Sequence, residues 1–151
     1  MIKRAINFGC GYKIRPSDDN FSWLNIDKHK YSPEVFVMDF DKEDLKLLFE
    51  DNLVEMIEVS HVLEHVKNII PFMNECYRIL KKDGQMLIKV PQGIGTWADP
   101  THVRAFSEIS FRYYCGYAFD ESYGINCKFK NITTYIVPNQ DGGELVVVLQ
   151  K

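Results

Sequence analysis

The feature of this sequence that most constrains its fold is a series of short apolar runs, each of which leads into glycine, aspartate or histidine. They are Ala5–Phe8 before "GCGYK", Trp23–Asp27, Val35–Asp39, and Leu53–Ser60 before His61. Apolar runs of roughly four to eight residues are typical of buried strands. Because ligands bind outside the carboxyl ends of the strands in an open parallel sheet, we expect the residues at the ends of these runs to line one site.

Helices and further strands are expected after these runs. Asp41 has the character of a helix N-cap, and Leu45, Leu48 and Phe49 follow it at helical spacing. A second helix is expected to begin or restart at Pro71, to carry Lys81 and Lys82 near its C-terminus and to end at Asp83-Gly84. The remaining expected elements are a strand over 85–91, a long loop over 92–106, a short helix from Ser107 to Tyr117, and a hairpin of strands 125–137 and 144–149. This order indicates an α/β sheet that is mostly parallel with an antiparallel edge.

The composition is that of a single globular domain, which we expect to span residues 1–151. The 18 basic and 21 acidic residues give a formal charge of −3, so the chain lacks the basic excess typical of nucleic-acid or membrane binding. No apolar run approaches the ~20 residues of a membrane span, and the N-terminus does not have the pattern of a secretory signal. The four cysteines form no C-x-x-C pair. We therefore expect a cytoplasmic protein with reduced thiols.

The stretch "VSHVLEHV" contains His61, Glu64 and His65 in the order of an inverted zinc-peptidase motif. A peptidase would need this string in the middle of a helix, together with a third ligand downstream. Here an apolar strand runs directly into His61. We therefore expect no metal site, structural roles for Glu64 and His65, and a position near the pocket for His61.

Taken together, these segments resemble the class I S-adenosylmethionine-dependent methyltransferases, in particular a small subgroup with the glycine loop LN(L/F)GCG. The matching stretches are "INFGCG" (Ile6–Gly11), "WLNID", "VMDF", "VSHVLEHV", "ECYRILKKDGQMLIKVP" (Glu75–Pro91) and "DPTHVRAFS" (Asp99–Ser107). The resemblance implies a Rossmann-like three-layer sandwich. Its mostly parallel seven-stranded sheet would end in an antiparallel C-terminal hairpin, and its N-terminal helices would be reduced.

The resemblance also implies S-adenosylmethionine as the methyl donor. Asp27 would hold the ribose hydroxyls of this cofactor, and Asp39 would lie beside its adenine. The full set of expected cofactor-binding residues is Asn7, Gly9, Cys10, Gly11, Asp27, Asp39 and Ser60.

Several positions depart from the family pattern. Asn7 stands where many relatives have an acidic residue, and Lys13 stands where a third glycine would be. Only eleven residues, Tyr12 to Ser22, separate the glycine loop from the second strand, so the usual first helix must be very short or missing. We expect an open pocket that substrate, a partner or a second copy completes.

Two other functions remain open at this point. A nicotinamide-dependent oxidoreductase is partly consistent with the glycine loop and the later Asp27, although Ile14 stands where the third glycine of that fingerprint belongs. A non-catalytic cofactor-binding subunit would account for the departures from the family pattern.

The methyl acceptor is expected to be a small molecule or a glycan. Methyl transfer depends mainly on alignment of the reactants, and a hydroxyl acceptor also benefits from a general base. The candidate catalytic residues are His61, His102 and Arg104, and Asp99 is a further candidate base in the loop 92–106. Trp97, Tyr113 and Tyr114 are candidates for an apolar wall over the acceptor.

Overall fold

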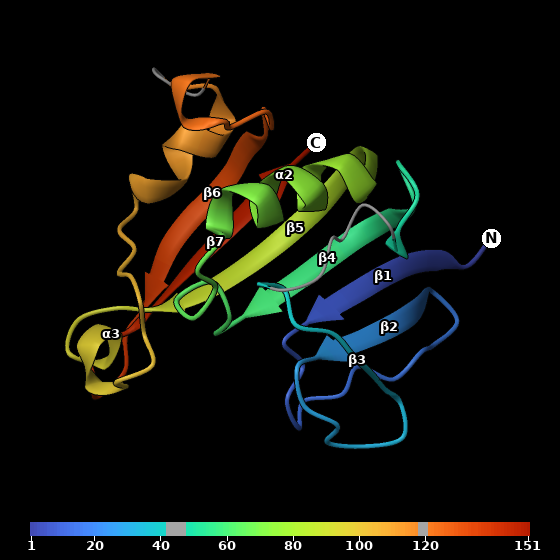
Figure 1. Ribbon diagram of the computed structural model, residues 1–151, viewed down its shortest axis with the longest axis horizontal. Coiled ribbons are helices and arrows are strands. Elements are labelled where there is room, and N and C mark those ends of the chain that lie inside the picture. Colours follow the sequence, from blue (N-terminus) through green and yellow to red (C-terminus); the bar gives the residue numbers. More distant parts are fainter. Residues whose placement is uncertain (42–47, 118–120) are drawn as a thin grey trace.

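The computed structural model describes residues 1–41, 48–117 and 121–151, in which strands form one seven-stranded sheet in the order β3-β2-β1-β4-β5-β7-β6 (Figure 1). The strands are β1 (Lys3–Phe8), β2 (Phe21–Asp27), β3 (Val35–Val37), β4 (Val54–Ser60), β5 (Leu80–Pro91), β6 (Lys130–Val137) and β7 (Glu144–Gln150). β1 to β5 pair in parallel, whereas β7 is antiparallel to both β5 and β6. The expected mostly parallel sheet with an antiparallel C-terminal hairpin is confirmed.

The strand order brings the carboxyl ends of β1, β2 and β4 together. β1 lies between β2 and β4, and Phe8 is level with Ile26 on one side and with Val59 on the other. From β1 the chain first moves outward through β2 and β3, then crosses to β4 and β5 on the opposite side. An open α/β sheet binds its ligand at such a reversal of strand order.

Helix α2 (Ile69–Ile79) packs on the sheet through apolar residues at helical spacing. Its buried residues are Ile69, Phe72, Met73, Cys76 and Ile79. The ring of Phe72 lies 5.3 Å from the ring of Phe8 and 5.4 Å from that of Phe40. Pro71 lies in the first turn, where its missing N–H costs no helical hydrogen bond.

The C-terminal end of α2 differs from the prediction. The helix ends at Ile79, Leu80 is already extended, and Asp83-Gly84 lie within β5. Lys81 pairs with Glu55 of β4 at 2.6 Å and does not lie in the last helical turn, where Arg78 is the basic residue. Pairing between β4 and β5 therefore overrides the local signal for a helix C-cap.

Other elements are shorter than predicted. β6 begins at Lys130, not at residue 125, and β3 ends at Val37. The helix expected from Ser107 to Tyr117 is a 3-10 helix, η1 (Ser110–Cys115), and it is followed by η2 (Glu121–Tyr123). The loop 92–106 contains one short helix, α3 (Gly95–Ala98). Of the helix expected after Asp41, residues 42–47 lie outside the described residues, and Leu48 and Phe49 follow them.

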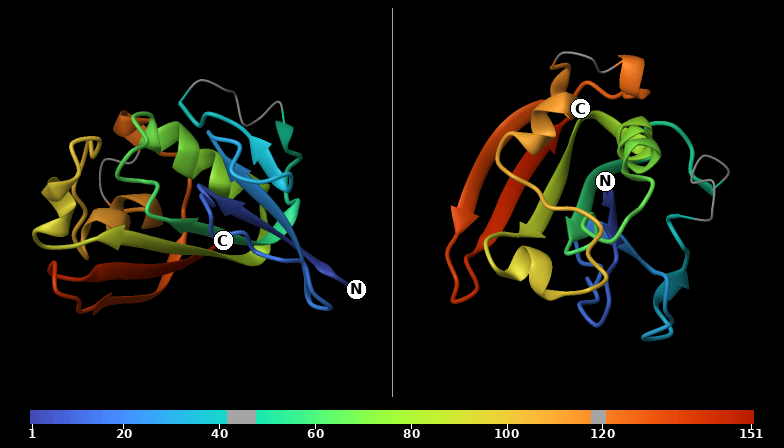
Figure 2. Two further views of the ribbon diagram at one scale, coloured as in Figure 1. Left: turned by 90° about the horizontal axis from the view of Figure 1, so that it is seen from below. Right: turned by 60° about the vertical axis from the view of Figure 1, so that its left-hand side comes forward.

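The described helices leave one face of the sheet uncovered. α2 lies on one side of the sheet (Figure 2), and Phe111 of η1 belongs to the same buried cluster as α2. On the opposite face, Asn7 Nδ2 donates to the backbone oxygen of Lys13 at 3.0 Å, and Arg15 donates to both carboxylate oxygens of Glu58 at 2.7 Å. The segment 12–20 thus lies against this face. Within the described ranges, two of the three expected layers are present, namely α2 and the sheet. The segment 12–20 lies where the third layer would be.

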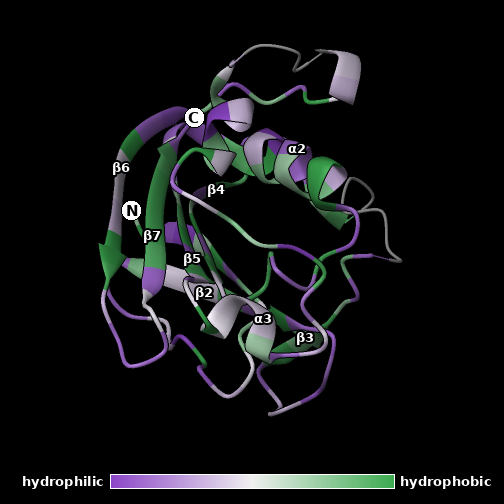
Figure 3. Cartoon of the chain, turned by 90° about the vertical axis from the view of Figure 1, so that its left-hand side faces the viewer, coloured by the Kyte–Doolittle hydropathy of each residue, from purple (hydrophilic) through white to green (hydrophobic). Residues whose placement is uncertain are grey.

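The distribution of hydrophobic residues agrees with this arrangement of strands and helices. In Figure 3 the hydrophobic colour runs along β7, while α2 carries both hydrophobic and hydrophilic residues. Val147 of β7 is fully buried, whereas Tyr135 of the neighbouring edge strand β6 is 47% exposed. None of the helices in the described ranges has the length and apolar character that a membrane crossing requires.

We predict that Phe72→Ala lowers the free energy of unfolding by about 3–5 kcal/mol, because it removes a buried ring and leaves a cavity between α2 and β1. Phe36→Ala is the matched control, since Phe36 is 47% exposed, and it should change stability by less than ~0.5 kcal/mol. Chemical denaturation followed by circular dichroism measures both changes. Equal losses in the two variants would contradict the assigned core.

Candidate functional site

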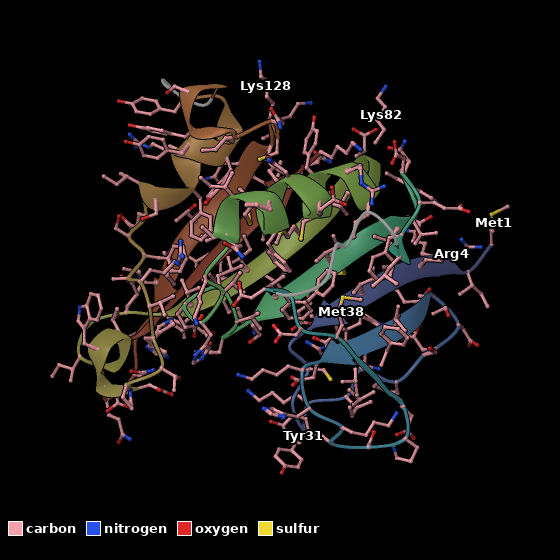
Figure 4. The ribbon with its side chains drawn as sticks, viewed as in Figure 1. Met1, Arg4, Tyr31, Met38, Lys82 and Lys128 are labelled. Carbon is pink, nitrogen blue, oxygen red and sulfur yellow. The ribbon has the colours of Figure 1, made fainter. Side chains whose placement is uncertain are left out.

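A pocket of about 610 Å³ opens at the carboxyl ends of β1, β2 and β4. This size is within the range of pockets for small ligands and cofactors, about 300–1,000 Å³. Its lining residues are Gly9, Gly11, Asp27, Lys28, Tyr31, Asp39, Phe40, Asp41, His61, Val62, His65, Val66, Lys67, Thr101 and Val103. We call it the main pocket. Tyr31, labelled in Figure 4, projects from the loop after β2, at the end of the sheet opposite Arg4.

The glycine loop has a conformation that other residues would not tolerate. Gly9 has φ +66°, and a Cβ at this position would lie 2.0 Å from Cγ2 of Val62. Gly11 also has a positive φ, +51°, and a Cβ there would meet open space. Gly9 is therefore required by the close approach of the turn after β4, and Gly11 keeps the floor of the pocket open to a ligand.

Asp27 is held at the end of β2 by backbone groups. Its Oδ2 accepts a hydrogen bond from the N–H of Gly11 at 2.9 Å, and its Oδ1 accepts one from the N–H of His29 at 3.0 Å. The residue is 8% exposed and lines the main pocket. Each oxygen has a second lone pair, so this oriented carboxylate can accept further hydrogen bonds from a ligand.

Asp39 and Asp41 form the side of the main pocket beyond β3. Asp39 Oδ1 accepts from the N–H of Asp41 at 3.1 Å. Asp41 Oδ1 in turn accepts from the N–H groups of Lys67 and Asn68, both at 2.9 Å, just before α2 begins. Asp41 therefore binds the exposed amides at the start of α2 and fixes this helix relative to the pocket.

Three of the expected cofactor-binding residues do not line the main pocket. Asn7, Cys10 and Ser60 line a smaller pocket of about 250 Å³ that also includes Arg15 and Glu58. Only Gly9, among the expected set, lines both. Asn7 is 4% exposed, and its amide also donates to Asn25 Oδ1 at 3.0 Å. Burial, followed by the charge of Asp27, raises the pKa of Cys10 to about 11, so its thiol stays protonated.

His61 lies at the turn after β4, between two carboxylates. Its φ is +55°, which is uncommon for a residue other than glycine. Its Nε2 is 2.7 Å from Glu144 Oε2, and its Nδ1 is 3.4 Å from Glu64 Oε1. Glu64 first, and then Glu144, raise the pKa of His61 above its ordinary value of 6.5, against the opposing effect of burial. The imidazole is thus oriented in the wall of the main pocket.

His65 lies in the same wall, and His102 lies behind it. The two rings meet edge to face with their centroids 4.7 Å apart. His65 Nδ1 is 3.0 Å from Thr101 Oγ1, and His102 Nδ1 is 2.7 Å from the backbone oxygen of Thr96. The loop after β5 is therefore held against the turn after β4, and the N–H of Val103 reinforces this contact by donating to the backbone oxygen of Glu64 at 2.8 Å.

The other candidates for acceptor recognition lie away from the pocket wall. Arg104 Nη2 donates to the backbone oxygen of Lys67 at 2.9 Å, and its buried Nε has no partner among the described residues. Trp97 is 67% exposed, and Tyr114 belongs to the buried core. Tyr113 contacts Tyr117 and Tyr123. None of these aromatic residues lines the main pocket in the described part of the chain.

Sequence reasoning missed several residues that the structure brings to the site. Lys28 and Tyr31 line the main pocket, and their place directly after the second apolar run was an available signal. Glu144 contacts His61 across 83 positions of sequence, and no local pattern indicates this contact. Thr101 lies within the noted "DPTHVRAFS", but its contact with His65 depends on how the loop folds back.

Sequence comparison identifies the family. The family model described as a methyltransferase domain matches residues 6–88, which is more than half of the chain. This match includes the glycine loop, Asp27, Asp39 and the turn that carries His61. No curated protein sequence was found to match the chain.

Several solved structures have the same fold. An S-adenosylmethionine-dependent methyltransferase from Archaeoglobus fulgidus has a TM-score of 0.71 at 12% identity, covering 99% of this chain and 86% of the other. A chain of the complex formed by the Haloferax volcanii methyltransferase activator Trm112 has a TM-score of 0.70 at 14% identity, covering 98% of this chain and 82% of the other. A Burkholderia thailandensis N1-methyltransferase with bound S-adenosylhomocysteine has a TM-score of 0.65 at 12% identity, covering 99% and 71%.

The family match and the pocket together decide between the functions left open by the sequence. An adenosyl cofactor fits three features of the structure. They are the strand order of the sheet, the positive φ of the glycine loop at the switch point, and the size of the pocket. The methyltransferase-domain match over residues 6–88 favours an enzyme of this family over the oxidoreductase and over the non-catalytic cofactor-binding subunit. The chain belongs to the methyltransferase-domain family and is a class I methyltransferase that uses S-adenosylmethionine as its methyl donor.

Proposed function

We propose that the protein methylates a hydroxyl group of a small-molecule or glycan-type acceptor, which binds between His61 and the loop 92–106. The observation that carries this proposal is the position of His61, in the wall of the main pocket and 2.7 Å from Glu144. In the neutral ring Nε2 donates its proton to Glu144, so Nδ1 has the lone pair that can accept the proton of a hydroxyl during methyl transfer, an effect typically worth 10²–10⁴-fold in rate.

The cofactor is proposed to bind along the carboxyl ends of β1, β2 and β3. Asp27 would accept the two ribose hydroxyls, the backbone at Gly9 and Gly11 would pass beneath the amino acid part, and Asp39 would lie on the adenine side. The lining of the main pocket supports this orientation, because all four residues contribute to it. S-adenosylmethionine supplies an activated methyl group, so the protein needs mainly to align the acceptor in line with the sulfonium.

The loop 92–106 is proposed to recognise the acceptor. Thr101 and Val103 contribute to the main pocket, while His102 and Arg104 fasten the loop through Thr96 and Lys67. Under this proposal His102 and Arg104 act on the acceptor by holding the loop in place. A loop that closes over a site also excludes water from the reacting centre.

A partner or a second copy of the chain is proposed to complete the open site. The face of the sheet that no described helix covers and the exposed edge strand β6 support this, since Ile132 and Tyr135 of β6 are 51% and 47% exposed. One of the structural neighbours is itself described in complex with a methyltransferase activator. Light scattering of the purified chain, alone and with candidate activators, tests this part of the proposal.

The acceptor class is tested by transfer of a radiolabelled methyl group from S-adenosylmethionine to panels of sugars, hydroxylated metabolites, carboxylates and amines. We expect labelled ether products from hydroxyl acceptors. Labelling confined to carboxylates or amines would overturn the hydroxyl assignment, although the chain would still be a methyltransferase.

The role of Asp27 is tested by Asp27→Ala, which should weaken S-adenosylhomocysteine binding by about 1.5–3 kcal/mol, as expected for hydrogen bonds to a charged group. Isothermal titration calorimetry measures the change, and circular dichroism checks the fold. Asp19→Ala, at an exposed position before β2, is the control and should bind normally. Wild-type affinity in Asp27→Ala with an intact fold would place the ribose elsewhere.

The role of His61 is tested by His61→Asn, because asparagine tolerates the positive φ of this position. We expect methyl transfer to fall by about 10²-fold or more, as for loss of a general base. Affinity for S-adenosylhomocysteine should stay within about twofold, a difference below ~0.5 kcal/mol. His29→Ala, a substitution at an exposed histidine, is the control. Unchanged turnover in His61→Asn would remove the general base from the proposal.

The role of the loop is tested by His102→Ala and Arg104→Ala. Both variants should bind S-adenosylhomocysteine within about twofold of wild type. Methyl transfer should fall at least tenfold, which corresponds to ~1.4 kcal/mol in the barrier. If both variants instead lost cofactor affinity while turnover per bound cofactor stayed normal, the loop would belong to the cofactor site.

A further inference from the structure

We propose that Glu64, His65 and His102 form a binding site for a divalent transition-metal cation, with Zn²⁺ as the representative ion. Each residue offers one ligand atom, and these atoms all lie within 4.8 Å of one another. Glu64 and His65 belong to the turn after β4, whereas His102 comes from the loop after β5. The site does not depend on which acceptor is methylated, so it goes beyond the proposed function.

Glu64 is the first observation that points to a cation. Its side chain is 1% exposed, and neither carboxylate oxygen has a hydrogen-bond partner among the described residues. The nearest group that can carry a positive charge is the His61 ring, whose Nδ1 lies 3.4 Å from Oε1 and is charged only when the ring is protonated. A buried carboxylate without hydrogen bonds is costly unless a positive charge compensates it. The Oε2 atom in particular has neither a hydrogen bond nor an ion pair among the described residues.

The hydrogen bonds of His102 leave a lone pair on its other ring nitrogen. Its Nδ1 lies 2.7 Å from the backbone oxygen of Thr96, and a carbonyl oxygen can only accept. The proton of the neutral ring is therefore on Nδ1, and Nε2 carries a lone pair. Histidine ligands of metals commonly donate their second N–H to a carbonyl in this way.

The same reasoning applies to His65 through a chain of hydrogen bonds. Thr101 Oγ1 donates to Asp99 Oδ1 at 2.7 Å, and the backbone N–H of Thr101 donates to the same oxygen at 2.8 Å. The contacts from Thr101 lower the pKa of Asp99, so Asp99 stays an acceptor. With its only proton directed to Asp99, Thr101 Oγ1 accepts from His65 Nδ1 at 3.0 Å. The Nε2 of His65 therefore also has a lone pair.

Two imidazole nitrogens and one carboxylate are the protein ligands of some catalytic zinc sites. Several other divalent transition metals bind the same types of ligand. Around a tetrahedral zinc ion with bonds of about 2.0–2.2 Å, ligand atoms lie roughly 3.4 Å apart, so small side-chain rotations must close the present gaps. Coordination would neutralise Glu64 and join the loop 92–106 to the turn after β4. Within the "DPTH" stretch, Asp99 and Thr101 would orient His65, and His102 would bind the metal.

The set differs from the zinc-peptidase arrangement considered from the sequence. His61 is not a member, and the H-x-x-E-H string lies in a turn, not within a helix. The proposal departs from the expectation of no metal site, while the narrower expectation that His61 and His65 do not together hold zinc remains a prediction. The competing account of Glu64 is that a protonated His61 alone neutralises it, in which case no metal is needed.

The test is isothermal titration of the chelator-treated full chain with Zn²⁺. We expect one ion per chain, with the dissociation constant raised at least tenfold in Glu64→Gln and in His102→Ala. Thr101→Val, at an exposed position that is not a ligand, should also weaken binding tenfold or more by releasing His65. His29→Ala is the matched control and should bind as wild type. Thermal unfolding of the metal-free variants checks that each one folds.

Titration with Co²⁺ identifies the ligands independently, because thiolate ligands give a charge-transfer absorption that imidazole and carboxylate do not. We expect d–d bands without that absorption. The proposal is overturned if no saturable binding occurs at one equivalent, if Glu64→Gln and His102→Ala bind as tightly as wild type, or if the Co²⁺ spectrum shows thiolate ligation. None of these outcomes depends on methyltransferase activity, so failure of the metal site and failure of the proposed reaction can be distinguished.

Discussion

The close contact between the glycine loop and the turn after β4 is the constraint on which the site depends. Gly9 approaches Val62 so closely that a Cβ would lie 2.0 Å from Cγ2 of that valine. Because β1 pairs with both β2 and β4, this contact fixes the distance between the glycine loop, Asp27 and His61. Backbone pairing and the small size of Gly9 therefore determine the shape of the pocket. The positions of its polar side chains follow from this backbone arrangement.

The sequence was sufficient to predict most of this frame. Each parallel strand is a short apolar run, and the residues at the strand ends meet at the switch point because parallel strands share one carboxyl edge. The prediction was wrong where tertiary pairing overrode a local signal. Asp83-Gly84 suggested a helix C-cap, yet β5 starts at Leu80 because this segment pairs with β4 and Lys81 reaches Glu55.

Side-chain direction limited what could be predicted about the site. Alternate residues of a strand point to opposite faces, and Asn7 and Ser60 consequently lie beside the smaller pocket. Asp27 and the glycines were easier to place, because residues at the very end of a strand face the edge of the sheet. The contacts of Glu144 with His61 and of Thr101 with His65 could not be predicted, since they join segments far apart in the sequence.

The insertion of β7 between β5 and β6 has a consequence for how the protein is made. A ribosome releases β1 to β5 before β7, and β7, which pairs with the free edge of β5, carries Glu144 at its first position. The carboxylate that contacts His61 Nε2 therefore arrives with β7, after all the parallel strands. Up to that moment β5 is an unpaired edge, the kind of surface that other strands can join. Pairing of β7 with β5 thus completes the pocket wall beside His61 and covers the edge of β5 in one step.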